Sequence, residues 1–204
     1  LVTTGPLTNI ALALEKDPAI ASDIKEAYIL GGSFRIHGNI TPVTEYNIFA
    51  DPEAAQKVLT SDLKITLVPL DVCENNIFAD SMLTRDHLSD LRYQAKGEMI
   101  DYLCDKYPIY IDMWREYFQL GGFPMDDVIT AALALDDSLC HYTEPVHVEV
   151  ELEGRLTRGQ IIPFFGYQIN KYPEKERRNV RIAVSIEGKL FMNLFTDTLI
   201  KGCR

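Results

Sequence analysis

Several carboxylate and amide side chains of this chain could bind a polar ligand or a metal ion. Glu45 and Asn47 stand two residues apart, Asn39 precedes them in the same polar stretch, and Asp126 and Asp127 open a segment with helical periodicity. Together, carboxylates and amides offer both acceptors and donors to hydroxyl groups, and carboxylate oxygens are preferred ligands of Ca²⁺. Taken singly, each has a plainer interpretation. Acids at a helix start usually cap the helix, and polar loop residues usually form turns or face solvent.

The elements that must position these side chains alternate between short apolar runs and helical patterns. Lys25 to Leu30 and Lys64 to Val68 are predicted strands, and Leu1 to Thr4 has the pattern of the end of another buried strand. The segment Asp51-Pro52-Glu53 predicts the start of a helix. Strands separated by helices predict the α/β class, with a mainly parallel, Rossmann-like open sheet flanked by helices. In such sheets the loops that follow the strands build the active site.

The second half is expected to be helical first and then mixed. We see no repeat, no low-complexity segment and no linker, so residues 1–204 are predicted to form a single domain. The predicted elements are a helical stretch from Leu83 to about Leu120, a break at Gly121–Pro124, a helix after Asp126–Asp127, strands at Val146–Leu152 and Val180–Ser185, and a closing helix after Leu190.

Composition excludes some classes of ligand and location. The formal charge of −10 argues against a nucleic-acid polymer as partner, because such binding relies on basic patches that neutralise phosphates. No run approaches the roughly 20 apolar residues that a membrane span requires, so no membrane association is expected. The 4 cysteines show no C-x-x-C pairing and are predicted to be reduced thiols. We therefore expect a cytoplasmic protein.

Several motifs, taken in order, resemble those of the inosine-uridine nucleoside hydrolase family. Thr4–Ala11 resembles the family's T-G-P-L-T-N-I-A segment, and Glu45–Ala55 contains its E-Y-N-I and D-P-E-A-A motifs. The other matching segments are Leu30–Gly32, Gly38–Pro42, Leu70–Val72, Met125–Asp126 and Arg158–Gln160. The resemblance covers roughly Val2 to Leu199, and it implies the nucleoside hydrolase fold.

The resemblance also implies an activity and a metal. Members of this family cleave the N-glycosidic bond of ribonucleosides with a Ca²⁺-bound water. By position, Asp126 corresponds to a metal-coordinating aspartate, and Thr4 corresponds to a residue that lends its backbone carbonyl. Such oxygen donors suit Ca²⁺, which takes about six to eight oxygen ligands.

A small-molecule ribonucleoside is the partner that the resemblance implies, together with further copies of the chain in a homo-oligomer. Asn39, Glu45 and Asn47 correspond to groups that hold the ribose hydroxyls. Leu30 occupies a position that packs beneath the sugar. Tyr110, Trp114 and Tyr117 fall in the region that borders the base in this family, although a helical aromatic stripe usually faces a core.

The sequence departs from the family pattern at two places. The N-terminal D-x-D-x-x-x-D-D cluster, which supplies metal ligands and the general base, does not occur in these 204 residues, so no catalytic residue is identified. Met125 stands where many members have a histidine near the leaving base, and methionine cannot donate a proton.

Because of these departures, three hypotheses remain. The first is a ribonucleoside hydrolase whose first strands and Asp cluster lie upstream, with this chain alone inactive. The second is a non-catalytic homologue that binds ribose or a nucleoside. The third, a structural protein that lost its site, is disfavoured because Asn39, Glu45, Asn47 and Asp126 are all present.

Overall fold

The computed structural model describes residues 1–74, 80–166, 168, 171–172 and 177–202. Its helices are α1 (Thr8–Lys16), α2 (Ile20–Asp23), α3 (Tyr46–Ala50), α4 (Pro52–Leu59), α5 (Leu70–Cys73), α6 (Arg85–Gln94), α7 (Glu98–Phe118), α8 (Asp126–Leu135), the 3-10 turn η1 (Asp137–Leu139) and α10 (Gly188–Gly202). Its strands are β1 (Val2–Thr3), β2 (Ala27–Leu30), β3 (Ile65–Val68), β4 (Cys140–Tyr142), β5 (His147–Val150), β6 (Ile161–Phe164) and β7 (Val180–Ile186).

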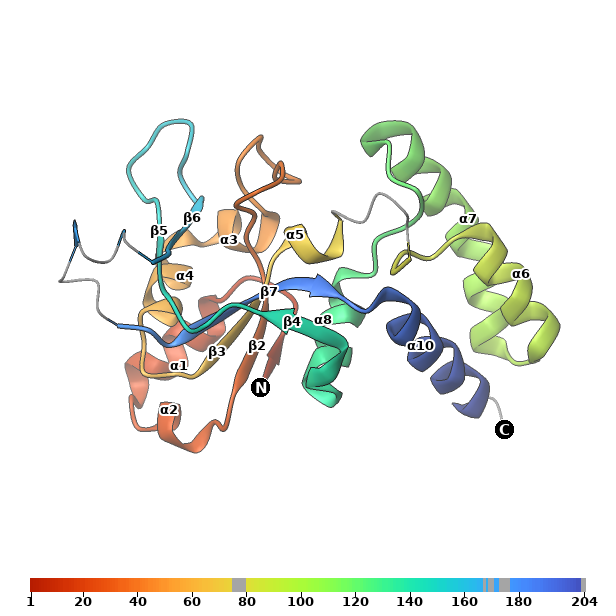
Figure 1. Cartoon of the computed structure of the whole chain (residues 1–204), viewed down its shortest axis with the longest axis horizontal. Coiled ribbons are helices and arrows are strands. Elements are labelled where there is room, and N and C mark those ends of the chain that lie inside the picture. Colours follow the sequence, from red (N-terminus) through yellow and green to blue (C-terminus); the bar gives the residue numbers. More distant parts are fainter. Residues whose placement is uncertain (75–79, 167, 169–170, 173–176, 203–204) are drawn as a thin grey trace.

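The main sheet has the strand order β1-β2-β3-β7-β4, as Figure 1 shows. The first four strands run parallel to one another, and β4 runs antiparallel to β7. In register, Thr3 pairs with Ile29, and Leu30 pairs with Val68. The α/β prediction is therefore confirmed, and the carboxyl ends of β1, β2 and β3 lie at one edge.

Apolar side chains alternate between the two faces of this sheet and build two cores. Ile29, Ile65 and Leu67 are fully buried in the core that α1 and α4 cover. Leu30 and Val68 belong to the other core, which includes residues of α6, α7, α8 and α10. This period of two follows from the pleat of a strand whose faces are both covered.

The predicted helix start at Asp51 is confirmed. The Asp51 carboxylate accepts a hydrogen bond from the backbone N–H of Ala54 (3.1 Å), and Pro52 is the first helical residue of α4. The other carboxylate oxygen accepts a hydrogen bond from the Thr8 hydroxyl (2.5 Å). One side chain therefore caps α4 and also ties it to α1.

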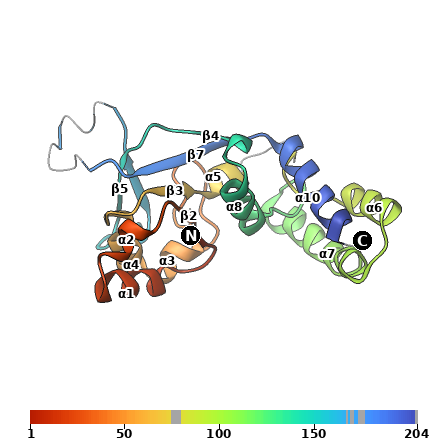
Figure 2. The same cartoon turned by 90° about the horizontal axis from the view of Figure 1, so that it is seen from below.

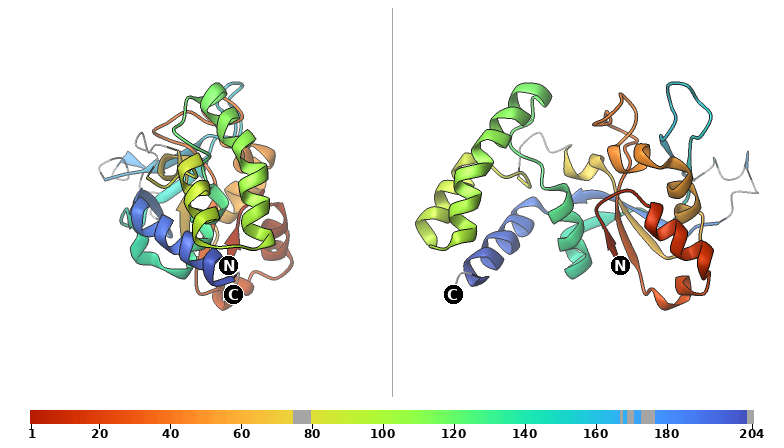
Figure 3. Two further views of the ribbon diagram at one scale, coloured as in Figure 1. Left: turned by 90° about the vertical axis from the view of Figure 1, so that its right-hand side faces the viewer. Right: turned by 180° about the vertical axis from the view of Figure 1, so that it is seen from behind.

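The predicted helical stretch from Leu83 to Leu120 is two helices, α6 and α7. The chain becomes extended at Ala95, and α7 begins after Gly97, which lies outside the helix. α7 contains Pro108 within its 21 residues. Figures 2 and 3 show α6, α7 and α10 grouped to one side of the sheet, with α8 between this group and the strands.

Two further features differ from the sequence-based expectation. The polar stretch that reaches Asn47 ends in a short helix, α3, and β5 pairs with β6 in a separate antiparallel hairpin. Cys73, Cys104 and Cys140 are free thiols, as predicted, while Cys203 lies outside the described residues. Among the helices of the described residues, none is both long and apolar enough to cross a membrane.

Candidate functional site

The candidate site lies at the carboxyl edge of the parallel strands. Thr4 directly follows β1, and Leu30 is the last residue of β2. α8 packs against β1 and β2, so its first residue, Asp126, is brought to the same region as Glu45, with which it interacts electrostatically. The fold therefore gathers predicted site residues that are up to about 120 positions apart in the sequence.

Glu45 is buried, with 2% of its surface exposed, and its carboxylate is held by three backbone N–H groups. Oε1 accepts a hydrogen bond from Asn47 (2.7 Å), and Oε2 accepts from Gly32 (3.1 Å) and Ile48 (3.1 Å). Burial raises the pKa of Glu45, and these hydrogen bonds oppose that rise. In this structure Glu45 caps α3 and holds the turn after β2 through the backbone N–H of Gly32. A contact between Glu45 and ribose stays a prediction.

The two predicted amides also have partners within the chain. The Asn47 side chain donates a hydrogen bond to the Leu30 carbonyl (3.3 Å), and the Asn39 side-chain oxygen accepts from the backbone N–H of Tyr46 (2.9 Å). Asn47 and Leu30 are buried, with 7% and 5% of their surfaces exposed. These residues form the wall of the site, and hydrogen bonds to the backbone fix their orientation.

Asp126 has a buried oxygen with no partner. Its Oδ1 makes no hydrogen bond within the described part of the chain, and the N-cap residue of α8 is Met125. Burial raises the pKa of Asp126 to about 7, with further contributions from Asp127 and Glu45, while a hydrogen bond from Cys73 lowers it. Asp126 and Asp127 lie in the first turn of α8, at the positive end of the helix dipole as the plain interpretation expects, but no side-chain hydrogen bond caps the helix.

Sequence reasoning missed Glu74, which lies in the same electrostatic cluster. Glu74 is the C-cap residue of α5, and its Oε1 is buried without a hydrogen-bond partner among the described residues. Burial, followed by the charges of Asp126 and Glu45, raises its pKa to about 8. One feature of the sequence indicates that Glu74 could belong to the site: it is an acid that closely follows the predicted strand ending at Val68 and the turn at Leu70.

Asp71, from the same turn, has a structural role. Its carboxylate accepts hydrogen bonds from the backbone N–H groups of Phe34 (3.1 Å) and Arg35 (2.7 Å). These bonds hold the loop after β2 against the turn after β3. Loop residue His37 is exposed, and its Nδ1 lies 3.4 Å from the Pro42 carbonyl oxygen.

The buried carboxylates make this edge suited to an oxygen-seeking cation. Burying an unpaired carboxylate costs desolvation free energy. A bound divalent cation can neutralise such carboxylates, so they need not take up protons. Asp126 has a buried carboxylate oxygen without a hydrogen-bond partner among the described residues, and Thr4, whose carbonyl is the other predicted ligand, directly follows β1. Among the described residues, however, no group of three His, Cys, Asp or Glu side chains could hold a metal ion. These residues therefore fit part of a Ca²⁺ coordination shell.

An aromatic cluster borders Asp126. Tyr107 packs edge-on against Phe123 with ring centroids 5.2 Å apart, and Trp114 stacks on Phe118 at 4.3 Å. Trp114 and Phe123, together with Met125 and Asp126, line a cavity of about 190 Å³. Tyr110 and Tyr117, by contrast, are 47% and 72% exposed, so the expectation of one core-facing stripe is wrong for both residues.

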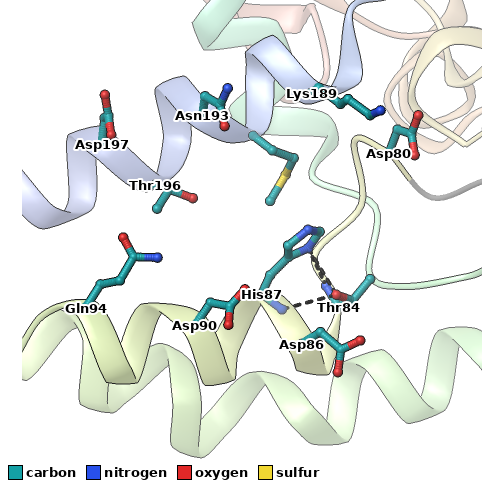
Figure 4. A pocket seen from close by; sticks show the side chains of 11 residues that line it. Asp80, Thr84, Asp86, His87, Asp90, Gln94, Lys189, Asn193, Thr196 and Asp197 are labelled. Carbon is teal, nitrogen blue, oxygen red and sulfur yellow. Dashed lines mark hydrogen bonds between the residues drawn. The ribbon is translucent and has the colours of Figure 1, made fainter.

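A cavity of about 660 Å³ lies away from this edge, between α6 and α10 (Figure 4). His87, in its lining, accepts a hydrogen bond from the Thr84 backbone N–H (3.2 Å) and belongs to the capping box that starts α6. The rest of the lining mixes acidic side chains such as Asp86 and Asp90 with Lys189 and with neutral polar side chains. Nothing in this cavity matches the predicted chemistry.

Gly32 gives a first prediction, because its backbone shapes the site. Its φ is +85°, and an added Cβ would lie 2.3 Å from Cδ1 of buried Ile161. We expect Gly32→Ala to lower the free energy of unfolding by about 1–3 kcal/mol, through backbone strain and overpacking. Urea denaturation measures this, with Gly202→Ala as control because no atom lies within 4 Å of its added Cβ. Equal losses in both variants would contradict the account.

The fold is that of an α/β protein with a mainly parallel sheet, and the predicted site residues lie at the carboxyl edge of its strands. The sequence profile of the inosine-uridine preferring nucleoside hydrolase family matches residues 1–193. The chain belongs to this family.

Known relatives agree with this assignment. The chain is 32% identical to a probable uridine nucleosidase 2 of Arabidopsis thaliana, over 99% of this chain and 61% of the relative. It is also 32% identical to the inosine-uridine preferring nucleoside hydrolase of Crithidia fasciculata, over 98% of this chain and 59% of the relative. A purine-preferring ribonucleoside hydrolase from Gardnerella vaginalis superposes with a TM-score of 0.83 at 32% identity, over 99% of this chain and 60% of that structure. The chain thus spans about three fifths of the length of these relatives.

Proposed function

We propose that the protein hydrolyses the N-glycosidic bond of ribonucleosides to ribose and free base, with Ca²⁺ bound at the site, when the family's N-terminal Asp cluster is present. The observation that carries this proposal is the unpaired, buried Oδ1 of Asp126 at the carboxyl edge of a nucleoside hydrolase sheet. Relatives described as uridine nucleosidases and inosine-uridine hydrolases support the substrate class.

The proposal assigns a separate role to each of the predicted site residues. Asp126, through its carboxylate, and Thr4, through its carbonyl, would hold the cation, which supplies a water of lowered pKa when bound. Asn39, Glu45 and Asn47 would hold the ribose hydroxyls, and the ring would lie over Leu30. Cleavage breaks the bond between the anomeric carbon and the base nitrogen, so positive charge develops on the sugar. Buried carboxylates near the ribose stabilise that charge.

The leaving base must gain a proton or depart as an anion. Met125 is buried, with 4% of its surface exposed, and cannot donate a proton. The nearby cavity wall of Trp114 and Phe123 offers stacking surface to a base. The proposal therefore places base recognition, rather than base protonation, at this wall.

Ribose release from inosine and uridine tests the proposal. With added Ca²⁺ we expect the wild-type protein, in a form that carries the family's N-terminal Asp cluster, to release ribose, and Asp126→Asn in the same form to lower the rate by a factor of about 100 or more, because a metal ligand is lost. The matched control is Asp90→Asn, an exposed residue of α6, which should retain the wild-type rate. No release by wild type, or equal rates in wild type and Asp126→Asn, would contradict the proposal.

Binding without hydrolysis is the second candidate function. It is favoured by the lack, within the described residues, of three side chains able to hold one metal ion. This alternative predicts that calorimetry detects nucleoside binding while no ribose appears. Ribose release that depends on Asp126 would exclude it.

We also propose that the protein forms homo-oligomers. α7 exposes several large apolar side chains among its charged residues, including Ile109 (71% exposed), Tyr117 (72%) and Tyr102 (56%). Exposed apolar patches of this kind mark association surfaces. Light scattering should give a mass at least twice that of one chain, and Ile109→Lys should reduce it. A monomer at every concentration tested would contradict this expectation.

A further inference from the structure

A cavity of about 250 Å³ lies beside the loop that follows β2, and we call it the loop cavity. Its lining comes from residues 33–43 together with Gln160, the residue before β6. The lining includes Arg35 and His37, and among the described residues no aspartate or glutamate lines this cavity. Several aspartates, by contrast, line the cavity between α6 and α10. In a chain with 30 acidic and 20 basic residues, the loop cavity therefore favours an anion.

Arg35 supplies the positive charge of the loop cavity. It is exposed, and its side chain forms no ion pair and no hydrogen bond with the described residues. Its guanidinium lies over the Phe34 ring, 5.3 Å from the centroid. Asp71 attracts Arg35 electrostatically, but the Asp71 carboxylate already accepts the backbone N–H groups of Phe34 and Arg35. The N–H donors of the guanidinium can therefore bind an anion.

Two further side chains offer donors to the same cavity. His37 Nδ1 lies 3.4 Å from the Pro42 carbonyl oxygen, which leaves Nε2 for a ligand. The side-chain amide of Gln160 makes no hydrogen bond with the described residues. A guanidinium, an imidazole and an amide together suit a phosphate group, whose several oxygens accept charge-assisted hydrogen bonds. One water takes about 30 Å³ in the liquid, so the cavity has room for such a group.

The loop that carries these donors is held in place by its own contacts. The backbone N–H of Gly38 donates to the Pro42 carbonyl (3.2 Å), and a Cβ added at Gly38 would lie 2.1 Å from the Thr44 carbonyl oxygen. The rings of Phe34 and Phe165 pack with centroids 6.2 Å apart, which ties the loop to the end of β6. A ligand therefore meets donors that are already positioned, and binding costs little ordering of the loop.

The same loop also carries part of the predicted ribose wall. Ser33 follows Gly32, whose backbone N–H donates to Glu45. His37 stands two residues before Asn39. A ribose held by Asn39 and Glu45 would thus lie next to the loop that lines the cavity. Because the base is attached to the anomeric carbon, the exocyclic 5′ carbon is the position that can carry a charged group away from the base.

We propose that the loop cavity binds a phosphate group on the 5′ oxygen of ribose, and that Arg35 neutralises its charge. The inference rests on the proposed function for the position of the ribose. Free inorganic phosphate has the same oxyanion chemistry, so the experiment compares the two sources of the group.

Calorimetric titration of the full chain with ribose 5-phosphate, ribose and inorganic phosphate tests this inference, and none of the three has a glycosidic bond to cleave. We expect wild type to bind ribose 5-phosphate about tenfold or more tightly than it binds ribose or inorganic phosphate. Arg35→Gln should raise the dissociation constant of ribose 5-phosphate about tenfold or more, because a charge-assisted contact is lost. The same variant should leave the constant for ribose within about twofold, since ribose carries no charge.

Arg178→Gln is the matched control. Arg178 is also exposed, forms no ion pair or hydrogen bond with the described residues, and stands two residues before β7 at the amino edge of the sheet. Its loss should change the constant for ribose 5-phosphate by about twofold or less, because salt screens a distant surface charge. Both arginines are exposed, so both variants should melt at the wild-type temperature, and lost binding then reports a lost contact.

The outcomes separate this inference from the proposed function. If ribose 5-phosphate binds no more tightly than ribose, or if Arg35→Gln and Arg178→Gln have equal effects, the inference fails and the proposed function stands. Inorganic phosphate that binds as tightly as ribose 5-phosphate also overturns the assignment to a phosphorylated sugar. If ribose 5-phosphate binds through Arg35 but a form with the Asp cluster releases no ribose from inosine, the inference stands and the hydrolase proposal fails.

Discussion

Arg181→Met is expected to lower the free energy of unfolding by about 2–4 kcal/mol, because it removes the centre of a partly buried ionic network. Arg181 lies on β7, and its guanidinium donates to Glu26 Oε1 (2.7 Å), to both Asp137 oxygens (2.7 and 2.8 Å) and to the Thr66 hydroxyl (2.7 Å). It also stacks on the Tyr142 ring at 4.2 Å. This one side chain therefore joins β7 to the segments before β2 and β4.

The loss would come mainly from the partners that remain. Without Arg181, Glu26 keeps an almost buried carboxylate (13% exposed), and the Thr66 hydroxyl, on a fully buried residue, loses one partner. Urea denaturation measures the effect. Arg177→Met is the control, because its ion pair with Asp62 is exposed and should contribute about 1 kcal/mol or less. A loss below about 1 kcal/mol for Arg181→Met would show that the network adds little stability.

The second large effect concerns pH in calcium-free protein. The pKa of Asp126 is raised to about 7 from its usual 3.8, so folding favours the protonated acid. Below the unfolded pKa both states are protonated and the raised pKa costs nothing. As pH rises through the window from about 4 to 7, the unfolded state loses its proton first, so stability falls.

Asp126→Asn should remove this pH dependence. We expect the variant to match wild type near pH 4 and to exceed its stability at pH 8 by about 2–4 kcal/mol, since each pKa unit corresponds to about 1.4 kcal/mol. Glu74 titrates in the same direction, and its pKa is raised in part by the charge of Asp126, so the difference reports Asp126 together with its coupling to Glu74. Urea midpoints in EDTA at both pH values provide the measurement. A variant with no greater advantage at pH 8 than at pH 4 would contradict the assigned burial.

The sequence was sufficient to predict features that depend on local pattern. Apolar runs predicted β2 and β3, and the Asp-Pro pair at Asp51 predicted the start of α4. The position of Glu45 after a strand end followed from the parallel-strand pattern, whereas Asp126 was assigned to the same site only through the family resemblance. These predictions succeed because strand order and helix caps are determined by neighbouring residues and by simple sheet geometry.

Features that depend on long-range contacts were not predicted. The hydrogen bonds from Phe34 and Arg35 to Asp71, and from Gly32 to Glu45, fix the loop after β2, and no local pattern encodes them. The burial of Glu74 arises from packing of α5 against α8, which sequence spacing does not reveal. The end of α6 at Ala95 was missed because the residues there carry helical periodicity.

A crystal structure of the protein with Ca²⁺ and a ribonucleoside would test the central claim most directly. The account predicts calcium on Asp126, with the ribose over Leu30 and within reach of Glu45 and Asn47. A nucleoside bound instead in the cavity between α6 and α10, or calcium bound away from Asp126, would contradict it.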